Sequence, residues 1–358
     1  MLRKVNIKSY RELAGLSQDS LGVVAGVTRQ TIASWENGST QPTFAELAKV
    51  ANALHVPIEL LLGEESGLEV GLLFRADDPA ALTPELRALL SRKAADYAEL
   101  EEILGESSAV PMSRPLDGYD EYIVQQTAAE VRNWLGLGDT GAVSNLFSLL
   151  ENRGLKIIRH KLPETIFGFS AYTENHGALI VLNSEQSPER QLSTALHELG
   201  HLIFHRREYI AANAAPPKKG KDQRERSANA LAGAIMLPDK VVIMELHRYR
   251  HEWIPIPVLA DIKERYWVSM QMVVTRAGQV GILTEAQAGK QFGWLKKKYG
   301  INEPYKLSDL PGLSRLKKLT YTALLNGEIT STRASEILDL PLREVKKELS
   351  EWALQEAH

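Results

Sequence analysis

The chain has 358 residues, of which 44% are hydrophobic and 24% charged; these values are typical of two or three globular domains and exclude disordered or fibrous sequence. It contains no cysteine, which excludes disulfide bonds and cysteine-ligated metal centres. The net charge of −3 is unevenly spread, because residues 64–130 carry 15 acidic and 5 basic side chains whereas residues 263–318 carry 11 basic and 4 acidic ones. Each of these two segments is either a solvated helix face or a binding surface. As a binding surface, the basic segment could face the acidic segment or nucleic acid.

Residues 16–38 (LSQDSLGVVAGVTRQTIASWENG) have the pattern of two short helices joined by a tight turn. Ser17 and Thr28 can cap the two helices, and Gly26 lies in the turn, where a positive φ is needed. Ile32 and Trp35 are three residues apart, as the buried face of the second helix requires. This is a helix-turn-helix pattern, in which the second helix can lie in the major groove of DNA.

Residues 6–62, including the helix PTFAELAKVANALHV, resemble the XRE family of helix-turn-helix proteins, which have the lambda-repressor-like fold. The resemblance implies binding to a double-stranded DNA operator, and we expect a homodimer. It places these residues at the DNA: Gln18, Thr28, Arg29, Gln30, Thr31 and Ser34. Arginine pairs with guanine and glutamine with adenine through two hydrogen bonds, which suits Arg29 and Gln30 to this role. Residues 1–62 hold 6 basic and 5 acidic side chains, so this segment has little net positive charge to attract DNA phosphates. The alternative is therefore a helical hairpin that is used only for protein contacts.

The next segments predict a connector and a second domain. Thr83-Pro84-Glu85 is typical of a helix start and Gly105 of a helix end, so residues 64–109 form an acidic helical connector after the DNA-binding domain of residues 1–63. A short strand could precede this helix at residues 70–76. Residues 155–183 contain three strand-like runs (LKIIRH, FGFSAYT and ALIVLN), and most of the remaining chain is typical of helices. We therefore predict a mainly α-helical protein with a small β-sheet, in the α+β class.

The stretch SPERQLSTALHELGHLIFHR contains the motif His197-Glu198-Leu199-Gly200-His201 on a helix that Ser187 and Pro188 begin. Residues four apart share a face of a helix, so both imidazoles can reach one metal ion. Glu198 can then act as the base for an attacking water. The alternative is a buried pair of histidines on a core helix.

Zinc usually takes a third protein ligand, and here it must come from a histidine or a carboxylate. His205 lies about 12 Å along the helix from His197, so joint ligation would need a break in the helix. Glu225 lies in the first turn of a second predicted helix (DQRERSANALAGAIMLP), whose small residues favour close packing. Asp222 is the rival ligand, although it is better suited to capping this helix.

Residues 110–285 resemble the ImmA/IrrE family of metallopeptidases, through LHELGHLIFHR, the segment from Glu225 to Asn229 that leads to Pro238, and DIKERYWVSMQMVVTRAGQVGIL. The resemblance implies a zincin-like domain with one Zn²⁺ per chain. It makes His197, His201 and Glu225 the zinc ligands and Glu198 the catalytic residue. We expect this domain, with a helical extension, to span residues 110–303.

The predicted reaction is hydrolysis of a peptide bond, in which zinc polarises the carbonyl and Glu198 passes a proton to the leaving amine. An extended substrate would add to the edge of the small sheet. Tyr172, His176 and His205 are candidates for stabilising the transition state or supporting a ligand. The basic loop of residues 213–226 is either an exposed connection or a lid over the cleft.

Residues 304–358 predict a small three-helix unit with Leu324, Ile337, Leu340 and Leu349 in its core. This unit serves packing or dimerisation, and the alternative is a second contact with nucleic acid. We also expect a cytoplasmic protein without membrane contact, because no apolar run approaches the roughly 20 residues of a membrane span.

The domain order predicts a DNA-binding regulator whose zinc endopeptidase cleaves a regulatory protein, such as a repressor, in response to stress, phage or a mobile element. The alternative is a non-proteolytic repressor or antitoxin-like regulator with a toxin partner, in which the peptidase fold binds or senses. Glu198 favours the enzyme, because a scaffold needs no base beside a metal.

Overall fold

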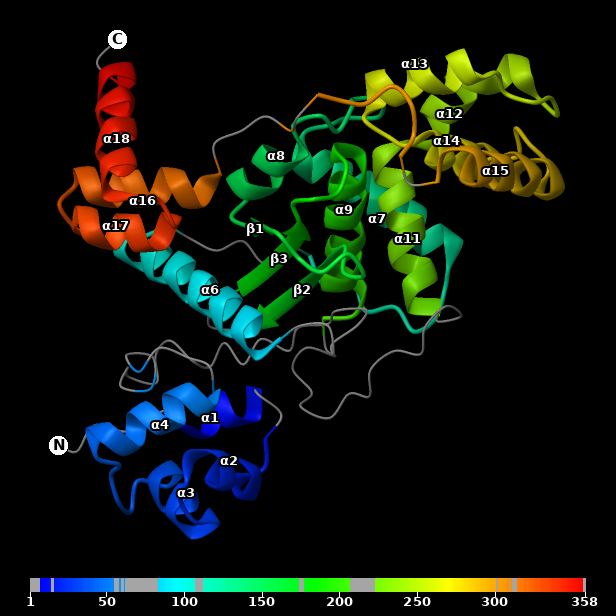
Figure 1. Ribbon diagram of the computed structural model, residues 1–358. Coiled ribbons are helices and arrows are strands. Elements are labelled where there is room, and N and C mark those ends of the chain that lie inside the picture. The colour runs from blue at the N-terminus through cyan, green and yellow to red at the C-terminus, as the bar shows by residue number, and fades with distance from the viewer. Residues whose placement is uncertain are drawn as a thin grey trace. The chain divides into compact units, whose positions relative to one another are not determined.

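The computed structural model describes residues 7–13, 16–54, 58, 61, 83–106, 112–173, 177–206, 223–300, 302–308, 310 and 314–356. The chain divides into two compact units (Figure 1). The first unit comprises Met1–Leu73, Asp78–Glu106 and Leu319–His358, and the second comprises Phe74–Asp77 and Ser107–Lys318. The predicted strand at residues 70–76 lies outside the described residues.

The first unit begins with four helices, α1 (Ile7–Leu13), α2 (Gln18–Ala25), α3 (Arg29–Glu36) and α4 (Phe44–Leu54). The predicted caps are confirmed, because Ser17 accepts a hydrogen bond from the Ser20 amide and Thr28 accepts one from the Thr31 amide. Gly26 has φ 73°, the left-handed conformation that the turn requires. The predicted helix-turn-helix is therefore present, and Ile32 and Trp35 are buried in its core as expected.

The remainder of the first unit comprises the connector helix and the C-terminal helices. The connector helix α6 (Pro84–Leu104) begins at the Thr83 cap and ends at Gly105 in the left-handed conformation, as predicted. The tail forms α16 (Arg315–Leu325), α17 (Ser331–Leu338) and α18 (Leu342–Glu356). The predicted apolar residues of the tail pack together: Ile337 is buried, and Leu324, Leu340 and Leu349 are partly buried. Arg333 of α17 joins the tail to α6 through ion pairs with Asp96 at 2.7 Å and Glu99 at 2.6 Å.

A mixed three-stranded sheet lies in the second unit, as predicted. Its strands are β1 (Lys156–His160), β2 (Gly168–Thr173) and β3 (Gly177–Asn183), in the order β1-β3-β2. Strand β3 is parallel to β1 and antiparallel to β2, with Ser170 opposite Ile180. All residues of the central strand β3 are buried, whereas β2 lies at an edge of the described sheet.

Helices surround this sheet and extend away from it (Figure 1). They are α7 (Glu121–Leu135), α8 (Leu146–Asn152), α9 (Pro188–Phe204), α11 (Gln223–Met236), α12 (Asp239–Leu246), the 3₁₀ helix η3 (His247–Tyr249), α13 (Ile256–Tyr266), α14 (Met270–Gln279) and α15 (Glu285–Tyr299). Helix α9 packs on the sheet with one side and against α11 with another. Its predicted apolar stripe is buried, comprising Leu192, Leu196, Leu199 and Ile203.

Helices α9 and α11 approach each other closely at Gly200. A Cβ atom at this position would lie 3.0 Å from the Cα atom of Ala228, which is closer than van der Waals contact allows. The predicted small-residue face of α11 is therefore used for close packing, and Ala228 and Ala232 are buried there. This contact sets the separation of the two helices that carry the candidate metal ligands.

We expect Gly200→Val to force α9 and α11 apart and to lower the free energy of unfolding by about 1–3 kcal/mol, as overpacking of a core does. The matched control is Gly293→Ala on α15, where an added Cβ meets nothing within 4 Å. Alanine in a helix is more favourable than glycine by roughly 0.5–1 kcal/mol, so this control should be neutral or stabilising. Urea unfolding measures both, and equal midpoints for the two variants would contradict the close approach.

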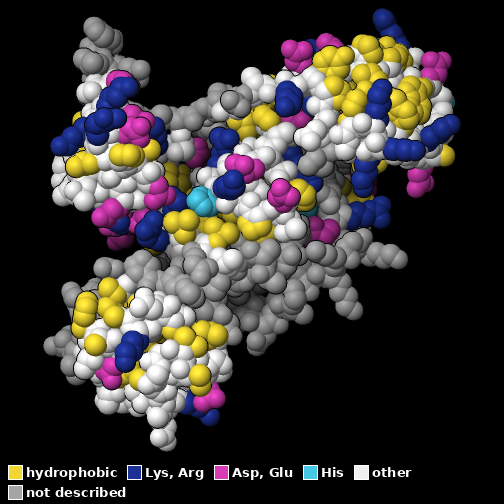
Figure 2. Space-filling view, viewed as in Figure 1, with side chains coloured by type: hydrophobic (Ala, Val, Ile, Leu, Met, Phe, Trp, Pro, Cys, Tyr) yellow, Lys and Arg dark blue, Asp and Glu magenta, His cyan; other side chains and the backbone are white. Residues whose placement is uncertain are grey.

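The surface of the second unit carries several exposed large hydrophobic side chains at its α12–α15 end (Figure 2). They include Ile243, Met244, Trp253 and Trp294. Among the described helices, none is by itself both long and apolar enough to cross a membrane, and one bent pair, α11 with α12–η3, meets that criterion by length and composition.

Candidate metal centre

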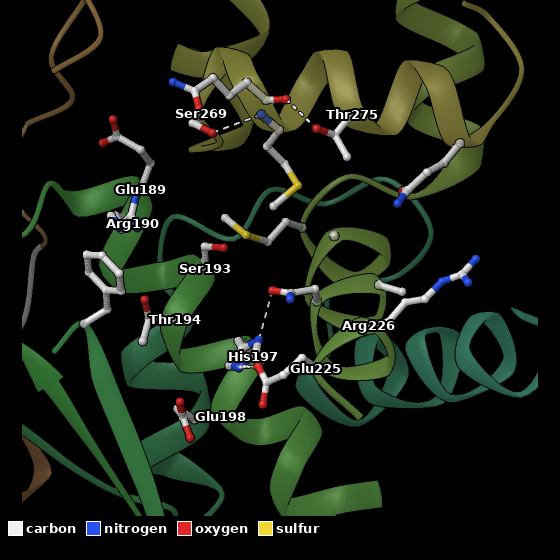
Figure 3. A pocket seen from close by; sticks show the side chains of 18 of the residues that line it. Glu189, Arg190, Ser193, Thr194, His197, Glu198, Glu225, Arg226, Ser269 and Thr275 are labelled. Atoms are coloured by element: carbon white, nitrogen blue, oxygen red, sulfur yellow. Dashed lines mark hydrogen bonds and ion pairs between the residues drawn. The ribbon is translucent and has the colours of Figure 1, made fainter. Parts of the chain in front are cut away.

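Three side chains from α9 and α11 converge on one point in the second unit, and Figure 3 shows two of them, His197 and Glu225. His197 and His201 lie one turn apart on α9, and their Nε2 atoms are 3.1 Å apart. Glu225, in the first turn of α11, places Oε2 3.2 Å from His197 Nε2 and Oε1 3.2 Å from His201 Nε2. The three residues proposed as ligands from the sequence are thus brought together with one nitrogen or oxygen atom each facing a common centre.

The far side of each imidazole is held by a second residue. His197 Nδ1 lies 3.0 Å from Asn229 Oδ1, one turn after Glu225 on α11. An amide oxygen only accepts, so His197 carries its proton on Nδ1 and leaves Nε2 with a lone pair. His201 Nδ1 lies 3.0 Å from His205 Nδ1, and donation from His201 to His205 likewise leaves His201 Nε2 free to bind a metal.

This donor set fits zinc. Two imidazole nitrogens and one carboxylate oxygen are the ligands of many catalytic zinc sites, which keep a fourth position for water or substrate. Burial alone would raise the pKa of Glu225, but its contacts with the imidazoles of His197 and His201 outweigh burial and hold the pKa well below its usual range. Glu225 is therefore an anion at neutral pH, as a carboxylate ligand of zinc must be.

Glu198 lies beside this centre and faces the sheet. Its side chain is buried, and Ser170 of β2 donates a hydrogen bond from Oγ to Glu198 Oε2 at 2.5 Å. Both His197 and Glu198 line the same cavity. A buried carboxylate that accepts a hydrogen bond from a hydroxyl and lies next to two imidazoles has the position of a general base or acid.

A cavity of about 910 Å³ opens in front of these residues (Figure 3). Its walls come from α9, α11, α14 and the segment that leads into β2. Hydrophobic side chains line part of it, namely Phe167, Met236, Met272 and Phe292. A cavity of this size and mixed lining has room for a few residues of an extended peptide, and it is equally within the range of small-ligand pockets.

Arg190 forms a cationic part of the cavity wall, on the same face of α9 as His197 and about 10 Å before it along the axis. Its guanidinium lies 3.9 Å from the centre of the Phe167 ring, and burial lowers its pKa. Within the described residues, no carboxylate lies within ion-pairing distance of it. The neighbouring Glu189 is instead paired with buried Lys263 at 2.7 Å. Arg190 is thus suited to bind an anionic group that enters the cavity.

The remaining candidates of the second unit are placed differently. Tyr172 is half-buried under the guanidinium of Arg206, 5.0 Å from its ring centre, and does not line the described cavity. His205 is buried at the end of α9, where it contacts His201 rather than the centre itself. His176, Asp222 and residues 213–222 of the basic loop lie outside the described residues.

The contributions of Asn229 and Ser170 were not predicted from the sequence. Asn229 belongs to the segment that resembles the ImmA/IrrE family, but the sequence alone assigns it no role. Its spacing of four from Glu225 does place both residues on one face of a helix. Ser170 belongs to a strand-like run, and no sequence pattern indicates which buried helix residue it meets. Both contacts depend on how the elements pack.

The candidate DNA-contacting residues of the first unit lie on or near α3. Arg29 and Gln30 are exposed at the start of this helix, and Thr31 and Ser34 are partly exposed. Thr28 is the cap of α3, where its hydroxyl also lies 2.8 Å from that of Thr31. The amide of Gln18 donates to Glu36 at 2.8 Å, so α2 and α3 are tied together beside the exposed face.

Comparisons with known proteins agree with both parts of this description. The family model described as the IrrE N-terminal-like domain of the M78 peptidases matches residues 150–277, which include all residues of the candidate metal centre. A helix-turn-helix model matches residues 7–61. An uncharacterized HTH-type transcriptional regulator of Bacillus subtilis, YgzD, is 38% identical over 56 residues, which cover 16% of this chain and 85% of the relative. Both resemblances predicted from the sequence are confirmed.

Proposed function

Because the chain belongs to the helix-turn-helix family of transcriptional regulators and carries an IrrE N-terminal-like peptidase domain, we propose that it is a DNA-binding regulator that cleaves another regulatory protein with zinc. The observation that carries this proposal is the convergence of His197, His201 and Glu225 on one point, with Glu198 beside it in the same cavity. A buried histidine pair on a core helix would not need a carboxylate from a second helix at that point.

In this proposal, each protein group has a distinct task. His197, His201 and Glu225 would hold the zinc, which when bound polarises a carbonyl and makes a water more acidic. Glu198 takes the proton from the attacking water and delivers it to the leaving amine. Ser170 keeps the Glu198 carboxylate turned toward the reaction site, and Asn229 and His205 keep the imidazoles in the tautomer that leaves Nε2 free.

The substrate would bind in extended form along β2. This strand is at the edge of the described sheet, and Phe167 and Gly168 at its start line the cavity. A peptide added to this edge gains backbone hydrogen bonds and passes in front of α9. Since an extended chain rises about 3.3 Å per residue, Arg190 would meet a side chain about three residues from the cleaved bond, and an acidic one would suit it.

The fusion to a helix-turn-helix domain favours a substrate that is itself at the DNA. A tether between a peptidase and an operator-binding domain raises the effective concentration of the peptidase near proteins bound there. We infer that the substrate is a repressor or similar regulator whose removal answers stress, phage or a mobile element.

We expect Arg29→Ala combined with Gln30→Ala to weaken binding to the specific operator by tenfold or more, because each two-bond contact to a base is worth about 1–3 kcal/mol. Non-specific binding should change less. Lys49→Ala, an exposed charge on α4, is the matched control and should keep discrimination between operator and random DNA. Mobility-shift titrations over a range of salt concentrations measure both affinities. Unchanged discrimination in the double variant would show that α3 does not read the operator.

A further inference from the structure

The second unit carries a surface in which aromatic and basic side chains are interleaved. Helix α15 presents Lys290, Trp294, Lys297 and Lys298 on one side, because Lys290 lies four residues before Trp294, and Lys297 and Lys298 lie three and four residues after it. Trp253 meets Trp294 from the loop after η3, and Arg250 is an exposed cation of the same loop. We call these six residues the aromatic–basic surface. Trp253 is 45% exposed and Trp294 is 36% exposed, which is high for the largest hydrophobic side chain.

The loop and the helix that form this surface are fastened to each other. Gln291 of α15 donates to the Ile254 carbonyl at 2.7 Å and accepts from the Ile254 amide at 3.3 Å. Gln287 donates to the His251 carbonyl at 2.5 Å. The Trp253 and Trp294 rings meet edge to face with centroids 5.6 Å apart. The aromatic–basic surface is therefore held in a defined shape by contacts beneath it.

Glu252 is an exposed acid in the same loop, but no ion pair joins it or another described acid to the cations of this surface. In the part of the chain that the structure describes, Arg250, Lys290, Lys297 and Lys298 have no carboxylate within ion-pairing distance. Lys298 lies instead over the Trp294 ring, 4.6 Å from its centre. By contrast, Arg265 on α13 pairs with both Glu245 and Asp261 at 2.6 Å.

A purely local explanation accounts for only part of this pattern. Lysines in the last turn of a helix are favoured by the helix dipole, which explains Lys297 and Lys298. It does not explain Lys290 near the middle of α15, Arg250 on the loop, or the exposure of two tryptophans among these charges. A cluster of exposed cations on one face is typical of surfaces that bind the phosphate backbone of DNA, and the Trp294 ring holds one of these cations, Lys298, in place.

We propose that the aromatic–basic surface is a second, sequence-independent binding site for the phosphate backbone of duplex DNA. The chain brings its own duplex to this surface, because the helix-turn-helix domain is tethered to it and raises the local DNA concentration. Lys290 and Lys297 are seven residues apart, about 10 Å along the helix, which equals the rise of three base steps. This role goes beyond the proposed function, since neither operator reading by α3 nor peptide cleavage requires it.

The test is the salt dependence of DNA binding by the full chain. Each phosphate contact contributes about −0.9 to the slope of log K against log salt, so Lys290→Ala, Lys297→Ala and Lys298→Ala together should reduce the steepness by roughly 2–3. The matched control removes three exposed charges from α18, as Arg343→Ala, Lys346→Ala and Lys347→Ala, and should leave the slope unchanged. Fluorescence anisotropy with a labelled duplex of random sequence measures the slopes.

A second arm separates this site from the operator-reading helix. In a chain that carries Arg29→Ala and Gln30→Ala, the duplex should still bind with a salt-dependent affinity, and the three α15 substitutions should then weaken it at least tenfold. Trp294→Ala should weaken binding without changing the slope, because it removes no charge. An unchanged slope in the α15 variant overturns the proposal and favours an acidic protein as the occupant. An effect seen only with single-stranded DNA also overturns it.

Discussion

Replacing Glu225 by alanine should greatly lower the zinc occupancy of the second unit. The wild-type chain should hold about one zinc ion, because three protein ligands and an open position are the usual arrangement of a catalytic zinc site. His197→Ala should have the same effect. Since Glu225 Oε2 and Oε1 lie 3.2 Å from the two imidazole nitrogens, no other described carboxylate can replace it at that point. The loss of affinity should exceed the roughly 10–100-fold that removal of an outer hydrogen-bond partner causes.

Asn229→Ala tests that outer partner directly. It should weaken zinc binding by about 10–100-fold, because His197 would lose the acceptor that sets its tautomer. Glu121→Ala is the matched control, since Glu121 lines the same cavity but bonds only with Tyr119 and Gln125 among the described contacts. Metal analysis after dialysis, with chelator competition, gives the affinities. Full occupancy in Glu225→Ala would refute the ligand assignment and return attention to Asp222 or His205.

Glu198→Gln should abolish cleavage of the partner protein while zinc and DNA binding stay intact. The substitution keeps the size of the side chain and leaves the two imidazoles alone, but an amide cannot accept the proton of the attacking water. Loss of a positioned base typically costs about 10²–10⁴ in rate. Ser170→Ala should cause a smaller loss, because it removes only the hydrogen bond that directs the carboxylate.

The comparison is best made in cells, where any signal that activates the peptidase is present. Wild type, Glu198→Gln and the matched control Glu121→Gln are induced in parallel, and partner integrity is followed by immunoblot together with a reporter gene. The partner should be cut in the wild type and in Glu121→Gln but remain whole in Glu198→Gln. If it remains whole in all three and the reporter responds identically, the protein regulates without proteolysis.

Local sequence alone determined the helix boundaries, the strands and the pair of histidines in the candidate metal centre. The caps Ser17, Thr28 and Thr83 and the left-handed Gly26 act within one turn of the chain, so their signals are readable without tertiary structure. The three strands were visible as apolar runs. The sequence also predicts that His197 and His201 bind one metal ion, because residues four apart lie on the same face of a helix. Glu225 was reached partly by elimination and partly through the family resemblance.

Tertiary packing decided the remaining features. Gly200 allows α11 to approach α9 closely, and this approach brings Glu225 and Asn229 to the two imidazoles. The same dependence on packing explains why the sequence did not predict the bond from Ser170 to Glu198, the contact of Arg190 with Phe167 in the cavity wall, or the contact of Trp253 with Trp294. The physical reason is common to all of them. Each joins residues whose distance depends on how separate helices and strands pack, and no local propensity or spacing along the chain encodes that distance.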